Sequence, residues 1–108
     1  MAVDATTGSL LDLFADSDDH AHHRAEVERA ILAVGLEYDG HIDPNQVRER
    51  LPSWVQPQII GPTYRALCLL REIEPDGWTT NTDTRGRNTG KPARCYRLVT
   101  DAERQAPF

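Results

Sequence analysis

Residues 43–70, DPNQVRERLPSWVQPQIIGPTYRALCLL, contain two helical patterns that are joined by a short turn. Asp43 can accept a hydrogen bond at a helix N-terminus, and Pro44 suits the first helical position, where a backbone N–H would have no partner. The pattern predicts a helix that begins at Pro44, places Val47 on its buried face and is ended by Pro52.

The second helical pattern opens at Pro57 and continues until residues 74–77, Glu-Pro-Asp-Gly, end it. Its apolar side chains recur at helical spacing, which predicts a helix with one buried face. Pro62 conflicts with a continuous helix, because proline has no N–H to donate and its ring crowds the preceding turn. We therefore expect either a kink there, or a single turn at residues 57–60 and a helix that restarts at Pro62.

A further helix is expected before this stretch. Val27, Ile31, Val34 and Tyr38 recur at helical spacing, with Ala30 beside them, so the helix should start near residues 21–24, run through Tyr38 and stop at the Asp-Gly pair 39–40. Three small residues on this helix would allow a second copy to approach closely, which leaves a homodimer open: Ala30, Ala33 and Gly35.

The last predicted element is a hairpin. Residues 78–81 and 93–98 have the pattern of two antiparallel strands around a long loop. Trp54, in the turn before the third helix, and Trp78, at the start of the hairpin, are expected to cover the two ends of a thin core.

Three helices followed by a hairpin is the element order of a winged helix-turn-helix domain, an α+β fold. We expect this domain to occupy residues 23–100. Residues 1–22 are acidic, polar and predicted to be a disordered tail, and residues 101–108 form a short C-terminal tail.

The charges are distributed unevenly along the chain. The whole chain has 12 Lys and Arg against 17 Asp and Glu, but residues 1–23 hold five acids and no Lys or Arg. Residues 84–100 carry five basic side chains and no acid, interleaved with glycines. Glycine lets backbone amides approach a polyanion and arginine supplies forked donors, so the loop suits phosphate contact. A solvated hairpin tip is the alternative.

Three segments carry a family resemblance. Residues 43–52 (DPNQVRERLP), 60–67 (IGPTYRAL) and 90–98 (GKPARCYRL) resemble the second helix, third helix and final strand of winged-helix proteins common in phages and mobile elements of actinobacteria. The resemblance spans roughly residues 24–100 and implies binding to double-stranded DNA near regulatory or replication loci. Pro62 departs from the family pattern, which usually has a small helix former there.

A winged helix of this kind would place its third helix in the major groove and its wing on the backbone. On the third helix, Gln58 and Arg65 can reach base edges, and Thr63 flanks the buried face beside them. A solvated polar helix surface is the alternative for these positions. The expected wing contacts to phosphate are Arg85, Arg87, Lys91 and Arg94. For Arg94 and Arg97, the strand residues, the alternative is a position beside the body and pairing with Glu72 or Glu74.

The tail contains one apolar cluster, Leu10-Leu11-Asp12-Leu13-Phe14. It resembles the bacterial sliding-clamp-binding peptide in four of five positions, with Leu10 in place of the usual Gln. Leu11, Leu13 and Phe14 are therefore candidate partner-binding residues. The cluster can equally pack on its own domain or support a dimer. A protein-interaction adaptor or inhibitor that binds through this tail is the alternative to DNA binding.

Other classes of function find little support in the sequence. It shows no catalytic triad, metalloprotease motif or phosphate-binding loop, so we expect neither an enzyme nor a bound cofactor. Cys68 and Cys95 have no paired spacing, and the cluster His20, His22, His23 is expected to be solvated rather than a metal site. With no apolar run of membrane length and no signal-like start, we expect a cytoplasmic protein of a bacterial host.

Overall fold

The computed structural model describes residues 18–84 and 88–105. Within these ranges the fold is α+β, with four α-helices and one three-stranded antiparallel sheet, an arrangement compatible with a winged helix. None of the helices in these ranges has the length and apolar character needed to span a bilayer. The elements are α2 (Asp18–Glu37), β1 (His41–Ile42), α3 (Pro44–Glu49), a 3₁₀ turn (Pro57–Ile59), α4 (Ile60–Leu69), β2 (Ile73–Thr80), β3 (Pro92–Leu98) and α5 (Asp101–Gln105).

Helix α2 supplies the largest part of the core. Val27, Ile31 and Val34 are fully buried, which confirms the predicted inward face at these positions. Tyr38 was expected on the same face, but it follows the last residue of the helix and is 41% exposed. The helix begins at Asp18, several residues before the expected start and inside the segment read as tail. It ends where the Asp-Gly pair was expected to stop it: Asp39 has a φ of 57°, and the Gly40 N–H donates to the Gly35 carbonyl.

Helix α3 begins as its sequence predicts. The Asp43 carboxylate accepts a hydrogen bond from the Asn45 N–H at 2.8 Å, and Pro44 occupies the first turn. Val47 is buried, as expected. The helix ends at Glu49, three residues before Pro52.

Helix α4 is preceded by the separate turn that Pro62 suggested, although the helix restarts at Ile60 rather than at Pro62. Pro62 is thus the third residue of the helix, where its missing N–H breaks no hydrogen bond. The far end differs from the prediction. The helix stops at Leu69, because Arg71 adopts a φ of 60° and the Glu72 N–H turns back to the Leu67 carbonyl.

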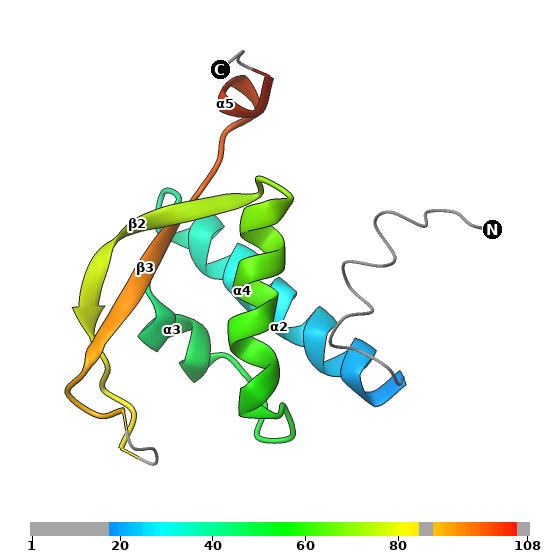
Figure 1. Cartoon of the computed structure of the whole chain (residues 1–108), viewed down its shortest axis with the longest axis vertical. Helices are drawn as coiled ribbons and strands as arrows, with labels where there is room; N and C mark the ends of the chain where they lie inside the picture. The colour runs from blue at the N-terminus through cyan, green and yellow to red at the C-terminus, as the bar shows by residue number, and fades with distance from the viewer. Residues whose placement is uncertain (1–17, 85–87, 106–108) are drawn as a thin grey trace.

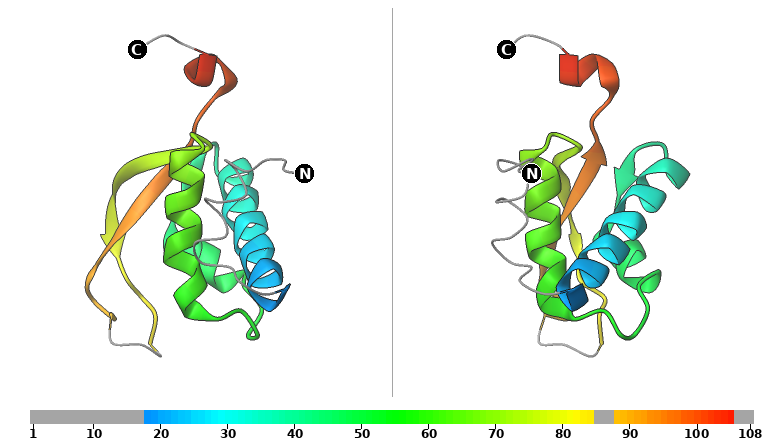
Figure 2. Two further views of the ribbon diagram at one scale, coloured as in Figure 1. Left: turned by 45° about the vertical axis from the view of Figure 1, so that its right-hand side comes forward. Right: turned by 90° about the vertical axis from the view of Figure 1, so that its right-hand side faces the viewer.

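The chain after α4 is strand rather than helix. Residues 73–75, expected to lie at the end of the helix, form the start of β2. β3 is the central strand, with β1 paired on one side and β2 on the other, both antiparallel. The β2–β3 hairpin runs beside α4, and its far end is level with the start of that helix (Figure 1). The left view of Figure 2 shows α4 between the hairpin and the N-terminal part of α2, whereas β3 packs directly on α2 at Gly35.

The small residues Ala30 and Gly35 allow α2 to pack closely against the rest of the chain. A Cβ at Gly35 would lie 2.7 Å from Leu98 Cγ, so the missing side chain lets β3 pack directly on the helix. Ala30 is also buried in the core. The idea that Ala30 and Gly35 offer a surface for a second copy is therefore wrong, because both already face the chain's own core.

Residues 101–105, expected to be part of a tail, form the short helix α5. The Thr100 hydroxyl accepts from the Glu103 N–H, while the Glu103 carboxylate accepts from the Thr100 N–H, which is a capping box. Glu103 also forms an ion pair with Arg97, so the helix is tied to the end of β3.

Candidate nucleic-acid interface

The outward face of α4 contains one of the expected base-reading residues, Arg65. Its side chain is exposed, with Gly61 and Leu69 exposed one turn to either side. Gln58 is exposed as well, but it lies in the 3₁₀ turn before the helix, where its amide donates to the Gln56 side chain at 2.9 Å. Both residues are therefore accessible from solvent.

Thr63 was expected to contact DNA, and the structure contradicts this. Its side chain is 0% exposed, and its hydroxyl donates to the Ile59 carbonyl at 2.8 Å. The hydroxyl thus satisfies a backbone acceptor in the first turn of α4, at the junction with the preceding 3₁₀ turn. Thr63 supports the start of the helix and does not belong to its outward face.

Three side chains of the β2–β3 hairpin, here called the wing, lie on the strand face that packs against α4. Tyr96 of β3 stacks on Tyr64 of α4 with ring centroids 4.6 Å apart, which fixes this face of the strand against the helix. Arg94 lies two residues before Tyr96 and therefore on the same face. Trp78 of β2 is the direct partner of Arg94, and the Arg94 guanidinium lies 4.4 Å from the centre of the indole ring.

A β-bulge explains why Trp78 shares this face. Pro75 pairs with Tyr96 and Trp78 with Arg94, so three steps along β2 match two steps along β3. One extra residue is accommodated at Asp76 and Gly77, where Gly77 has a φ of 87°. Without the bulge, strict alternation would send Trp78 to the opposite face from Pro75.

Arg65 of α4 and Arg94 of β3 lie on either side of a ring stack that joins the two elements. Tyr96 stacks on Tyr64, the neighbour of Arg65, and lies two residues from Arg94. Burial raises the pKa of Tyr96, while the positive charges of Arg94 and Arg65 act to lower this pKa. We call Arg65, Tyr96, Arg94 and Trp78 the basic-aromatic surface. It joins the outward face of α4 to the wing.

The two arginines of this surface have no carboxylate partner within residues 18–84 and 88–105. Lys91, exposed near the hairpin tip, has none in those ranges either. Arg97 is different, because it points to the other face of β3 and forms ion pairs with Glu74 and Glu103. Its pairing with Glu74 confirms one of the two expected partners.

The wing is held in place by α3. The Asn45 side chain donates to the Thr80 carbonyl at 2.9 Å and accepts from the Thr82 N–H at 3.1 Å. The Arg48 guanidinium donates a hydrogen bond to the side-chain amide oxygen of Asn45, and its Nε lies 4.0 Å from the Asp83 carboxylate. These contacts fix the direction in which the hairpin leaves the body. Arg85 and Arg87, at its tip, lie outside the described residues.

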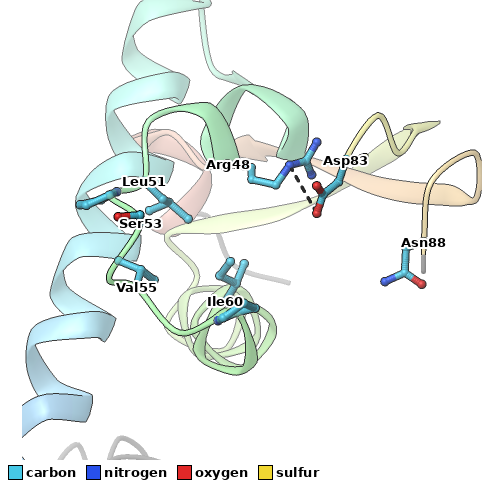
Figure 3. A pocket seen from close by; sticks show the side chains of 9 residues that line it. Arg48, Leu51, Ser53, Val55, Ile60, Asp83 and Asn88 are labelled. Carbon is cyan, nitrogen blue, oxygen red and sulfur yellow. Dashed lines mark ion pairs between the residues drawn. The ribbon is translucent and has the colours of Figure 1, made fainter. Parts of the chain in front are cut away.

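A cavity of about 420 Å³ lies between the wing tip, α3 and the start of α4. Figure 3 shows its apolar side, formed by Leu51, Val55 and Ile60, opposite the Arg48–Asp83 pair. Arg48 is thus partly neutralised at this position. The cavity separates the wing tip from Gln58 without adding an unpaired positive charge to the interface.

Both tryptophans are on the surface, contrary to the expectation that they cover the core. Trp54 is 52% exposed and meets the ring of His23 edge-on, with centroids 5.2 Å apart. Trp78 is 62% exposed. The core is closed instead by aliphatic residues of α2, β1 and α3. Reading Trp78 as a core residue therefore missed a member of the candidate interface, because its pairing with Arg94 depends on a register shift that the sequence does not show.

The histidines near the N-terminus have a structural use. His23 is buried, and its Nδ1 accepts a hydrogen bond from the Gln56 N–H at 2.8 Å, which ties α2 to the turn before α4. Among the described residues, no three or more His, Cys, Asp and Glu side chains are grouped so as to hold a metal ion. The candidate partner-binding residues Leu11, Leu13 and Phe14 lie outside the described residues.

The arrangement can bind a polyanion. Its two guanidinium groups can donate hydrogen bonds to phosphate or to base edges, and its aromatic rings offer flat apolar faces. Comparison with known proteins finds no matching family model, no similar protein of curated function and no similar solved structure.

Proposed function

We propose that this chain is a winged helix-turn-helix protein that binds double-stranded DNA without enzymatic activity. In this proposal α4 enters the major groove and the β2–β3 wing follows the phosphate backbone. It acts in regulation or replication, in the bacterial cytoplasm and in a phage or mobile-element setting, as the sequence resemblance implies. The observation that carries the proposal is that Arg65 and Arg94, without carboxylate partners among the described residues, flank the Tyr64–Tyr96 stack that joins α4 to the β2–β3 hairpin.

The arginines differ in whether they pair with an acid, and this difference supports the proposal. Arg48, Arg50 and Arg97 each pair with an acid, which is the ordinary state of a surface arginine in an acidic chain. Arg65 and Arg94 face the same side and keep their donors available. Phosphate oxygens are suitable acceptors for these donors, because charge-assisted hydrogen bonds from guanidinium to phosphate are strong and often bidentate.

Nearby acids do not oppose the proposal as strongly as the sequence suggests. Glu72 follows α4, but its carboxylate pairs with Arg104 of α5 at 3.3 Å. Asp83 in the wing faces Arg48. Each of these negative charges is therefore partly neutralised, which lowers its repulsion of a DNA backbone.

The test is a salt series of fluorescence-anisotropy titrations with a random 25-base-pair duplex. The Arg65→Ala/Arg94→Ala variant should reduce the slope of log affinity against log salt by roughly 1.8, since each lost phosphate contact removes about 0.9. The matched control is Arg29→Ala/Arg50→Ala, which removes two exposed positive charges outside the interface. Equal slopes for the two variants would contradict the proposal.

The alternative is a protein-interaction adaptor, and one observation favours it. Leu69 is 62% exposed and the adjoining Leu70 42% exposed at the end of α4, where a DNA backbone would gain nothing from them. An adaptor would bind a host or replication protein, for example the sliding clamp, through this end and through Leu11, Leu13 and Phe14. It should be indifferent to Arg65→Ala/Arg94→Ala and should lose partner binding when the three tail residues are replaced by Ala.

A further inference from the structure

We propose that Trp78 stacks on an unpaired DNA base, so that the interface takes single-stranded DNA next to a duplex. This inference rests on the proposed function, because it assigns a preferred DNA structure to the same surface. It concerns a residue that the groove-and-backbone arrangement does not require.

The first step is the exposure of Trp78. Its side chain is 62% exposed on the α4 side of the wing, at the middle of the hairpin rather than at its tip. The indole ring contacts the guanidinium of Arg94. Tryptophan is enriched at binding interfaces, and an exposed indole beside a guanidinium is suited to contact with a partner.

The second step is what surrounds the indole. Arg94 lies over the ring, Tyr96 lies two residues along the same strand face, and Arg65 of α4 follows Tyr64, the ring on which Tyr96 stacks. Aromatic rings interleaved with guanidinium groups are typical of surfaces that hold single strands, where bases stack on the rings and phosphates bind the cations. A guanidinium stacked on an aromatic face keeps the N–H donors at its edge free for phosphate oxygens.

The third step separates single-stranded from double-stranded DNA. Inside a duplex, both faces of each base are covered by the neighbouring base pairs, so a flat indole has no face to meet. An unpaired base next to a duplex exposes its face and can lie on Trp78 while Arg94 holds its phosphate. Because stacking uses a surface common to all bases, the contact should tolerate any sequence.

The test uses the full chain in a Trp54→Phe background, in which Trp78 is the single tryptophan. The probes are a blunt duplex of two complementary DNA strands and the same duplex with a single-stranded oligo-dT overhang. We expect the overhang to quench Trp78 fluorescence and to bind more tightly than the blunt duplex. Trp78→Ala should weaken overhang binding about 5- to 150-fold, the range for loss of one stacked base, and change blunt binding less than about twofold.

Trp78→Phe is the second variant and should keep most of the overhang preference, because phenylalanine also stacks. Trp78 is exposed, so these changes should leave the fold intact, which circular dichroism checks. If Trp78→Ala binds both probes as its parent does, the stacking proposal is overturned and duplex binding stands. An equal loss on both probes overturns it in favour of a duplex contact. Failure of the parent to bind either probe at low salt overturns both proposals and points to a protein partner.

Discussion

Asn45 is the residue whose replacement should release the wing from the body. In the native fold its side chain is only 9% exposed and makes three hydrogen bonds, to the Thr80 carbonyl, the Thr82 N–H and the Arg48 guanidinium. Each such bond contributes about 0.5–1.5 kcal/mol, for a gross loss of about 1.5–4.5 kcal/mol in Asn45→Ala. Thr80 and Thr82 are themselves exposed, so water can replace part of this loss. We expect the free energy of unfolding to fall by about 1–2 kcal/mol.

Urea denaturation measures this change, and hydrogen exchange shows where it acts. The Asn81 and Gly90 amides, which close the hairpin, should exchange faster in Asn45→Ala, while the amides of α2 should follow only the global change in stability. Glu49→Ala is the control, since Glu49 is exposed on the same helix and its loss should stay within about 0.5 kcal/mol. Equal effects of the two variants, or unchanged exchange in the hairpin, would refute the reasoning that α3 holds the wing.

Two further predictions test the packing of α2 and the docking of α5. Gly35→Ala should lower the free energy of unfolding by up to about 2 kcal/mol in chemical denaturation, because overpacking against Leu98 costs about 1–3 kcal/mol and the helix gain of Ala over Gly returns only roughly 1 kcal/mol. The sign should reverse when Leu98→Ala is already present, and a loss that persists there would exclude the clash. The Arg97 guanidinium and the Thr100 N–H lower the pKa of Glu103 to about 2, so α5 docking should be complete above about pH 4.5 and lost as pH falls toward 2. NMR chemical shifts of α5 measure this, and a midpoint near 4.5 would count against the ion pair with Arg97.

The features that sequence predicts well are those whose cause lies within a few residues. Asp43 caps the helix that follows it, and the pair at 39–40 ends α2 in a left-handed turn, because the groups that form these hydrogen bonds are local. The break before α4 was likewise expected from the chemistry of Pro62 alone. The regular spacing of Val27, Ile31 and Val34 identified the buried face of α2 for the same reason.

The features that it misses depend on contacts between distant residues. Residues 73–75 have no strong strand pattern, and they become strand by pairing with residues 96–98 of β3. The end of α4 at Leu69 was not foreseen because Arg71 is an unusual residue for a left-handed helix terminus. Thr63 lay at the border of the helical wheel, and its burial depends on the path of the preceding turn, to which its hydroxyl is bonded.

The candidate interface follows the same division. Arg65 and Arg94 were identified from residue type and local charge, which needs no tertiary knowledge. Trp78 was assigned to the core, because its face depends on a strand register that sequence alternation does not show. Their common location on one surface emerges from the packing of the hairpin against α4.

The bulge at Asp76 and Gly77 makes the two halves of the wing unequal in their tolerance of length changes. Beyond Asn81 and Lys91 the loop can gain or lose residues, because the hydrogen bonds that close the hairpin lie before it. Within β2 a single deletion at 76 or 77 would restore strict alternation and turn Trp78 away from Arg94. Homologous sequences should therefore vary in the length of the hairpin loop. They should retain the extra residue of the bulge, because it orients the Trp78 indole.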